Sequence, residues 1–336
     1  MHKKSKMLFN INICGIGFVG GSIVNLLLEN NIKFNAYDIV PYEHVKCKGQ
    51  YNYLRSVKTL VHTSEYDNNN INVYFICVPT PPHCNGHCDT SIVKGLVDDL
   101  SKLIKKKSII IIKSTIPPGT TQRLSELYSN DLIDIVFCPE FLREASANHD
   151  MYNANFALFG IPDYTQNNYN EIKSQQLEKT LMYLFTYVIY SHKTFNKTFN
   201  KVFSWFKNKC KKQEFKTFTR QSEQIELFKY TINTFLAVKV WYFNEIYEIC
   251  EKLNIDYQNF KTLFPLEPRL GVYGQIVPGD DNRFGYSKKC LPKEILAMTK
   301  IQKNLDIPNE VLCEIINRNE EYFRKKTLNT TFKELS

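Results

Sequence analysis

The sequence lacks any long hydrophobic run. No stretch of about 18 uncharged apolar residues occurs among its 336 residues, so a membrane-spanning helix is not expected. Glycine and proline are scarce, at 13 residues each, which excludes a collagen-like chain, and 43% hydrophobic content excludes a wholly disordered one. The basic start is followed by no apolar signal core. We therefore expect a cytoplasmic protein with one large domain or two medium ones.

Neither the cysteines nor the charge indicates a special class of protein. The 10 cysteines are scattered, which in a cytoplasmic chain of this size favours reduced thiols over a disulfide scaffold. The net charge of +9 suits an anionic ligand such as a nucleotide but is too diffuse to indicate nucleic acid. The segment HCNGHC over 83–88 has four potential metal ligands, yet its compact spacing hinders tetrahedral convergence. We expect no metal site.

Short apolar segments alternate with helix-like segments in the N-terminal half. This alternation predicts a parallel sheet with helices on both faces. The predicted strands are 9–14, 34–37, 73–78, 108–112 and 133–137, with 157–160 as a candidate for one more. The predicted helices are 22–29, 92–104 and 121–127.

Residues 163–220 differ in composition from the rest of the chain. Nine Lys and Arg residues fall between Lys193 and Arg220, against one acid. One interpretation is a basic, aromatic helix that contacts RNA or a membrane. The other is an insertion with solvated charges and with Phe203, Trp205 and Phe206 packed inward. Because charge runs are usually solvated, we favour the second and expect contact with neither nucleic acid nor membrane.

The C-terminal part is predicted to be helical. Residues 223–253 contain no proline or glycine, and apolar positions recur at spacings of three and four, as in a helix that links domains or forms a dimer face. A Pro/Gly-rich loop follows over 265–285, and 293–326 is helical with a break at Pro308. The sequence thus predicts an α/β protein: a Rossmann-type parallel sheet domain (1–162), an insertion that closes it (163–222), and a long connecting helix with a small all-helical dimerisation domain (223–336).

A glycine-rich turn follows the first predicted strand. The turn has the pattern GxGxxG, and its residues are Gly15, Ile16, Gly17, Phe18, Val19 and Gly20. Glycines allow a tight turn and close approach of the backbone to a pyrophosphate, which the helix N-terminus then faces. Asp38 follows at the end of the next strand, where it can accept a hydrogen bond from a ribose hydroxyl. The pattern predicts a dinucleotide site, and the acid favours NAD over NADP.

Three further motifs follow predicted strands, whose carboxyl ends line the ligand crevice of an open parallel sheet. The first is Val78-Pro79-Thr80, and the second runs from Lys113 through Ser114 and Thr115 to Thr120. The third, PEFLREA, carries the acids Glu140 and Glu144, either of which is a candidate for acid/base work.

Together these motifs resemble the UDP-glucose/GDP-mannose dehydrogenase family. The resemblance runs from about residue 10 to 328 and rests on GIGFVG, CVPTP, KSTIPPGT, PEFLREASA, EQIELFKYTINTFLAVKVWYFNEI and GYSKKCLPKE. The helical segment and EPRLG are more similar to the UDP-glucose branch. The resemblance implies oxidation of the C6 alcohol of UDP-glucose to a carboxylate, with NAD as the cofactor and reduction of two NAD⁺, by a homodimer.

The resemblance also implies roles for individual residues. Cys290 matches the nucleophile, which forms a thiohemiacetal and then a thioester. Lys229 and Asn233 match the pair that stabilises negative charge on the C6 oxygen, and spacing by four puts both on one helix face. Glu140 matches the residue that activates water. The remaining matches are Thr115 (water), Glu144 (nicotinamide), Arg269 (the neighbouring subunit's substrate), Glu294 (beside the nucleophile), and Phe141, Leu142 and Gly285 (substrate).

The chain departs from the family pattern at three places. Of the glycines before the nucleophile only Gly285 is kept, so Ser287 and Lys288 are expected to crowd the sugar, although Lys288 and Lys289 also favour a thiolate. Glu294 replaces an aspartate. The chain ends at Ser336, near where the family's C-terminal UDP-binding domain begins, so that domain is expected to be absent.

Two functions remain open from the sequence. One is an NAD-dependent nucleotide-sugar dehydrogenase that makes UDP-glucuronate. The other is a degenerate, non-catalytic paralogue that binds NAD and associates with a partner. Retention of Cys290, Lys229, Asn233 and both acids favours the enzyme, and loss of the glycines favours the paralogue. An unrelated Rossmann dehydrogenase acting on a small acid does not explain the CLPKE motif.

Overall fold

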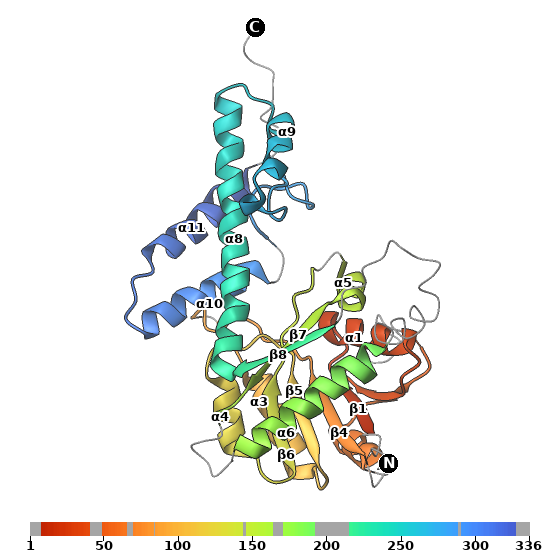
Figure 1. The fold of residues 1–336 in the computed structure, drawn as a ribbon. Helices are drawn as coiled ribbons and strands as arrows, with labels where there is room; N and C mark the ends of the chain where they lie inside the picture. The colour runs from red at the N-terminus through yellow and green to blue at the C-terminus, as the bar shows by residue number, and fades with distance from the viewer. Residues whose placement is uncertain are drawn as a thin grey trace, which may run out of the picture. The chain divides into compact units, whose positions relative to one another are not determined.

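The computed structural model describes residues 8–40, 49–65, 70–83, 85–143, 146–163, 171–191, 215–287 and 290–326. The chain forms two compact units (Figure 1). The first comprises Met1–Thr80 and Thr90–Leu227, and the second comprises Pro81–Asp89 and Phe228–Ser336.

One sheet of eight strands forms the centre of the first unit as far as the structure describes it. The strand order is β3-β2-β1-β4-β5-β6-β7-β8, and every neighbouring pair is parallel except β6 and β7. The first six strands therefore have the doubly wound order of dinucleotide-binding folds. The bounds are β1 (Phe9–Cys14), β2 (Phe34–Tyr37), β3 (Asn52–Leu54), β4 (Ile71–Ile76), β5 (Ser108–Ile112), β6 (Ile133–Phe137), β7 (Phe156–Ile161) and β8 (Lys216–Gln221).

Helices pack on both faces of this sheet, because its central strands are apolar along their whole length. All five residues of β5 are buried, as expected for a parallel strand covered on both sides. One face packs against α1 (Phe18–Glu29), α5 (Ala147–Asn153) and α6 (Glu171–Tyr183), which continues as η4 (Leu184–Ile189). The other face packs against α2 (Val57–Ser64), α3 (Ser91–Leu103) and α4 (Thr120–Tyr128).

The predicted fold class is confirmed, with differences in detail. The strands predicted at 9–14, 34–37, 108–112 and 133–137 have the observed bounds, and the optional strand at 157–160 is β7. β4 ends at Ile76, two residues before the predicted end, and α1 begins at Phe18 instead of residue 22. Two described parts of the predicted insertion contribute to the sheet domain: α6 covers the sheet, and β8 pairs with β7 from Phe156↔Lys216 to Ile161↔Gln221. Phe203, Trp205 and Phe206 lie outside the described residues.

The second unit is helical in its described part. The long helix α8 (Ser222–Lys252) begins in the first unit and continues in the second, close to the predicted 223–253. The other elements are α9 (Tyr257–Phe260), η5 (Lys261–Leu266), η6 (Pro268–Leu270), α10 (Leu291–Asn304), α11 (Glu310–Glu321) and η7 (Phe323–Lys325). Arg318 of α11 pairs with Glu245 and Glu248 of α8, which fixes these two helices together. The predicted break at Pro308 separates α10 from α11.

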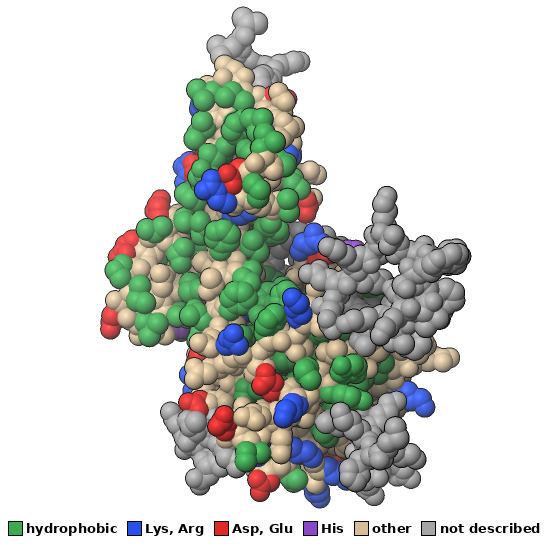
Figure 2. All heavy atoms as spheres, viewed as in Figure 1, with side chains coloured by type: hydrophobic (Ala, Val, Ile, Leu, Met, Phe, Trp, Pro, Cys, Tyr) green, Lys and Arg blue, Asp and Glu red, His purple; other side chains and the backbone are tan. Residues whose placement is uncertain are grey.

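The observed division of the chain differs from the predicted one at two points. The short segment Pro81–Asp89 belongs to the second unit, and the boundary near residue 222 falls after Leu227, inside α8. Hydrophobic side chains gather over α8 and around α9 (Figure 2). Within the described residues, no helix combines the length and the apolar character needed to cross a bilayer.

Candidate functional site

The glycine-rich turn joins β1 to α1 in the first unit. Gly15 has a positive φ of 90°, and its N–H donates to the carbonyl of Tyr37 on β2. A Cβ on Gly20 would lie 1.9 Å from the carbonyl oxygen of Gly15, so this position requires glycine. Gly17 begins α1 with no side-chain cap, and nothing lies within 4 Å of where its Cβ would be. The N-terminus of α1 therefore has no side-chain cap and has open space beside Gly17, as a phosphate site requires.

Asp38 holds the glycine-rich turn against the end of β2. Its carboxylate accepts hydrogen bonds from the backbone N–H of Ile16 (2.5 Å) and of Val40 (2.9 Å). Each carboxylate oxygen retains a further lone pair, and the residue is half-buried, so ribose hydroxyls can still donate to it. The turn lies where the strand order reverses between β1 and β4, which is where open α/β sheets bind ligands.

The loops after β4 and β5 are tied to each other. The Ser114 hydroxyl donates a hydrogen bond of 2.7 Å to the carbonyl oxygen of Val78, and this hydrogen bond links the two loops. Pro79 is exposed, whereas Thr80 and Thr115 are buried.

Glu226, near the start of α8, anchors the loop that follows Thr115. Its buried carboxylate accepts hydrogen bonds from Gly119 N–H (2.6 Å), Thr121 N–H (2.8 Å) and the Thr121 hydroxyl (2.5 Å) at the N-terminus of α4. Burial raises the pKa of the Glu226 carboxyl to about 7, against the lowering effect of these hydrogen bonds. Sequence reasoning missed this residue, because its partners are more than 100 residues away.

A buried ion pair lies at the end of β6. The Lys113 ammonium is 3.7 Å from Oε2 of Glu140, and the two side chains are only 7% and 11% exposed. Lys113 also contacts Sγ of Cys138 (3.5 Å) and the carbonyl oxygen of Pro139 (3.3 Å).

The described residues 141–143 of the PEFLREA motif are partly buried or exposed. The Phe141 ring packs near that of Phe156, and Leu142 packs on the sheet core. Arg143 makes an ion pair with Asp150 of α5, at 2.6 Å, and so lowers the pKa of the Asp150 carboxyl. Glu144 lies outside the described residues.

In the second unit, three of the predicted catalytic residues lie in one hydrogen-bonded cluster. Lys229 and Asn233 are both buried on the same face of α8, as their spacing predicts. Nδ2 of Asn233 donates to Oε2 of Glu294 at 2.5 Å, which joins α8 to the first turn of α10. Cys290 is the N-cap residue of α10 and is exposed, and its carbonyl accepts from Glu294 N–H.

Two asparagines that the sequence analysis missed hold the loop before Cys290. Oδ1 of Asn244 accepts from Gly285 N–H at 2.9 Å, and Asn319 both accepts from Tyr286 N–H and donates to its carbonyl. Gly285 has a φ of 74°, and a Cβ there would lie 2.4 Å from Oδ1 of Asn319. The Ser287 hydroxyl donates a hydrogen bond to the Asp281 carboxylate. Lys288 and Lys289, which were expected to favour the Cys290 thiolate, lie outside the described residues.

Arg269 and the 83–88 segment, both named by the sequence, form local structures. Arg269 is highly exposed and makes two side-chain hydrogen bonds, each 2.8 Å, to Glu267. In the 83–88 segment, His83 N–H donates to the His87 carbonyl, and a Cβ on Gly86 would meet Leu296 and Lys300 of α10. Cys84 is outside the described residues, and the described ones include no group of three or more potential metal ligands.

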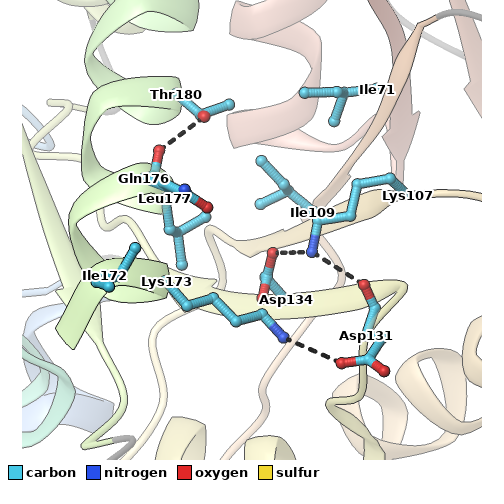
Figure 3. Close-up of a pocket in the computed structure, with 10 residues that line it drawn as sticks. All are labelled: Ile71, Lys107, Ile109, Asp131, Asp134, Ile172, Lys173, Gln176, Leu177 and Thr180. Carbon is cyan, nitrogen blue, oxygen red and sulfur yellow. Dashed lines mark hydrogen bonds and ion pairs between the residues drawn. The ribbon is translucent and has the colours of Figure 1, made fainter. Parts of the chain in front are cut away.

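A surface pocket of about 470 Å³ lies at the opposite ends of the strands from the glycine-rich turn (Figure 3). Its charges are paired within the pocket: Lys107 lies 2.6 Å from Asp134, and Lys173 lies 3.9 Å from Asp131. None of the predicted site residues lines it.

Comparison with known proteins assigns the two units to two domains of one protein family. Residues 9–177 match the NAD-binding domain of the UDP-glucose/GDP-mannose dehydrogenase family, and residues 223–321 match the central domain of that family. A UDP-glucose 6-dehydrogenase from Rickettsia typhi is 30% identical over 93% of this chain and 67% of its own length. One from Bacillus subtilis is 28% identical over 74% of this chain and 48% of its own length.

The fold is also found in a UDP-glucose dehydrogenase from Pyrobaculum islandicum. The match has a TM-score of 0.67 at 21% identity and covers 96% of this chain and 70% of that one. This chain thus spans about two thirds of the rickettsial relatives' length and about half of the Bacillus relatives' length.

The residues of the first unit fit NAD. The uncapped N-terminus of α1, the open space above Gly17 and the close contact at Gly20 form a cradle that side chains would fill. Asp38 supplies an acceptor at the distance along the chain that ribose recognition requires. NAD is therefore the cofactor of this domain.

Proposed function

Because the chain belongs to the UDP-glucose/GDP-mannose dehydrogenase family, we propose that it is a UDP-glucose 6-dehydrogenase, which converts UDP-glucose to UDP-glucuronate. The observation that carries this proposal is the cluster of Asn233, Glu294 and Cys290. The cluster retains the residue types of the family nucleophile and its surroundings within one hydrogen-bonded arrangement.

NAD⁺, when bound in this cradle, would supply the hydride acceptor for both oxidations. In the proposed reaction the N–H groups at the start of α1 bind the pyrophosphate, and Asp38 orients the adenosine ribose. Phe141, Leu142, Gly285 and, from a neighbouring subunit, Arg269 contact the nucleotide sugar. Glu144 lies near the nicotinamide.

Cys290 is the proposed nucleophile. After the first oxidation its thiolate forms a C–S bond to the aldehyde carbon, and the oxygen takes a proton to give a thiohemiacetal. Loss of hydride and of that proton gives a thioester. The N-cap position at α10 stabilises the thiolate, since N-terminal N–H groups favour negative charge. Lys229 and Asn233 stabilise the negative charge that develops on the C6 oxygen.

Hydrolysis completes the reaction. Thr115 positions a water molecule, and the Glu140 carboxylate takes a proton from it as it attacks the thioester carbon. The C–S bond then breaks and returns the Cys290 thiolate. In total the alcohol, two NAD⁺ and one water give the carboxylate, two NADH and three protons.

A homodimer through α8 is part of this proposal. The exposed side chains Phe228, Phe235, Tyr242 and Ile249 recur at intervals of seven residues along α8, so they form one apolar stripe. A second copy of this stripe is the partner that such a self-complementary surface fits. Light scattering should give twice the chain mass for the wild type and a lower mass for Phe235→Glu, since Phe235 is 62% exposed.

The decisive test is NADH formation by the purified protein. We expect two NADH for each UDP-glucuronate with UDP-glucose, and a far lower rate with GDP-mannose or a UDP-N-acetylhexosamine. Faster oxidation of either of these would refute the UDP-glucose assignment. Tight NAD binding, with no oxidation of any nucleotide sugar, would instead support the non-catalytic paralogue.

A further inference from the structure

Lys113 is a buried cation to which neither the sequence motifs nor the proposed reaction assigns a task. Lys113 directly follows β5, and two residues separate Glu140 from the end of β6. Because β5 and β6 are neighbouring parallel strands, the side chains of Lys113 and Glu140 come together. An ammonium with 7% exposure has given up nearly all its hydration, which is costly unless a counter-charge compensates. The Glu140 carboxylate, 3.7 Å away, is that counter-charge.

Lys113 is a cation among the groups that interact electrostatically with Glu140. In the described residues these groups include Cys77, Lys113, Cys138 and Tyr190. Burial raises the pKa of both thiols and of the Tyr190 phenol, so all three are neutral at physiological pH. Burial lowers the pKa of Lys113, whereas the Cys138 sulfur and the Glu140 carboxylate raise it. Because the Cys138 thiol is neutral, the Glu140 carboxylate supplies the negative charge that offsets burial of the ammonium.

We propose that Lys113 is a positioning residue that keeps the buried Glu140 carboxylate ionised and in place, so that Glu140 can accept a proton at neutral pH. The role of Glu140 rests on the function proposed above, whereas the ion pair does not. The contacts of the Lys113 ammonium to Cys138 and to the Pro139 carbonyl fix it beside the loop that carries Glu140. A carboxylate at 11% exposure with no cation beside it would take up a proton more readily.

The test measures the protonation of Glu140 directly. The protein is labelled with carboxyl ¹³C-glutamate, the Glu140 signal is identified by its loss in Glu140→Gln, and its titration is followed by NMR. In the wild type the midpoint should lie below neutrality. In Lys113→Met it should rise by about one to three pH units, the usual effect of an opposite charge at this distance. Lys113→Arg should keep it close to the wild type.

The matched control is Lys107→Met. Lys107 directly precedes β5, whereas Lys113 directly follows β5, and Lys107 pairs with Asp134. Loss of Lys107 therefore removes the same charge at the other end of the strand. This variant should leave the Glu140 midpoint unchanged. An unchanged midpoint in Lys113→Met overturns the proposal. Should that variant not fold, a wild-type midpoint above neutrality overturns it equally.

Kinetics separate this proposal from the proposed function. With UDP-glucose and NAD⁺, Lys113→Met should release about two NADH per subunit in a burst and then turn over slowly. Intact mass should show the acyl group accumulated on Cys290, because only hydrolysis needs Glu140 as a base. If the wild type oxidises no nucleotide sugar, the proposed function fails, while the titration still decides whether Lys113 ionises Glu140. Normal turnover of Lys113→Met at neutral pH would contradict the proposal that Lys113 keeps Glu140 ionised.

Discussion

Removing the Glu226 carboxyl group should destabilise the first unit strongly at low pH, where the group is protonated, and much less at high pH. Glu226→Ala leaves the N–H groups of Gly119 and Thr121 without their acceptor, and Thr121 is fully buried. At about 1–3 kcal/mol for each unsatisfied group, the free energy of unfolding should fall by roughly 3–5 kcal/mol at pH 5.

The pH dependence follows from the raised pKa of Glu226. A folded-state pKa of about 7, against the ordinary 4.5, makes its contribution fully present below the unfolded value and lost as the pH rises through 7. A shift of this size corresponds to about 3 kcal/mol. Wild-type stability should therefore decline between pH 5 and pH 8, and at pH 8 the loss in Glu226→Ala should shrink to roughly 1–2 kcal/mol.

Calorimetric unfolding of the wild type, Glu226→Ala and Glu226→Gln at pH 5 and pH 8 measures these differences. Glu226→Gln removes the titration and should flatten the pH dependence. Glu223→Gln is the comparison variant: Glu223 lies one turn earlier on α8 and its charge contributes to the raised pKa of Glu226, so this variant should reduce the pH dependence without abolishing it. The reasoning is refuted if Glu226→Gln keeps the wild-type pH dependence, or if Glu226→Ala costs less than about 1 kcal/mol at pH 5.

Three further predictions concern the site residues. Asp38→Ala should weaken NAD binding by roughly 10- to 100-fold, because a charged acceptor is lost, and unchanged affinity by calorimetry would exclude its role. Cys290→Ser should stop the reaction between the two oxidations, since a hydroxyl is a poor nucleophile at neutral pH; UDP-glucuronate formation by this variant contradicts the assignment. Gly285→Ala should lower the melting temperature of the second unit, because its φ is positive and Asn319 occupies the Cβ position. Stability equal to the wild type would argue against this crowding.

Local sequence was sufficient for much of the first unit. A continuous apolar run such as SIIII can be satisfied only as a buried strand, and a turn such as GIGFVG permits a backbone path that other residues forbid. The long helix α8 was equally clear, since no proline or glycine interrupts its pattern. For the same reason Lys229 and Asn233 could be placed on one face.

Other elements carried too little local signal. β3 has three residues, and β8 reads KTFTRQ within a basic region, so its strand character depends on pairing with β7. Burial of α6 likewise depends on the sheet it covers. The sequence therefore predicted neither α6 nor β8 as a separate element of the region that closes the first domain.

The sequence by itself indicated the alternation of strands and helices, the glycine-rich turn and the shared helix face of Lys229 and Asn233, because each depends on neighbours within a few residues along the chain. Only the tertiary structure revealed the partners of these residues: Glu226 at Thr121, Lys113 beside Glu140, and Asn319 against Gly285. These pairs join segments separated by about 25 to more than 100 residues. Burial makes such polar contacts strong, and burial is a property of the folded chain, which no residue's local sequence carries.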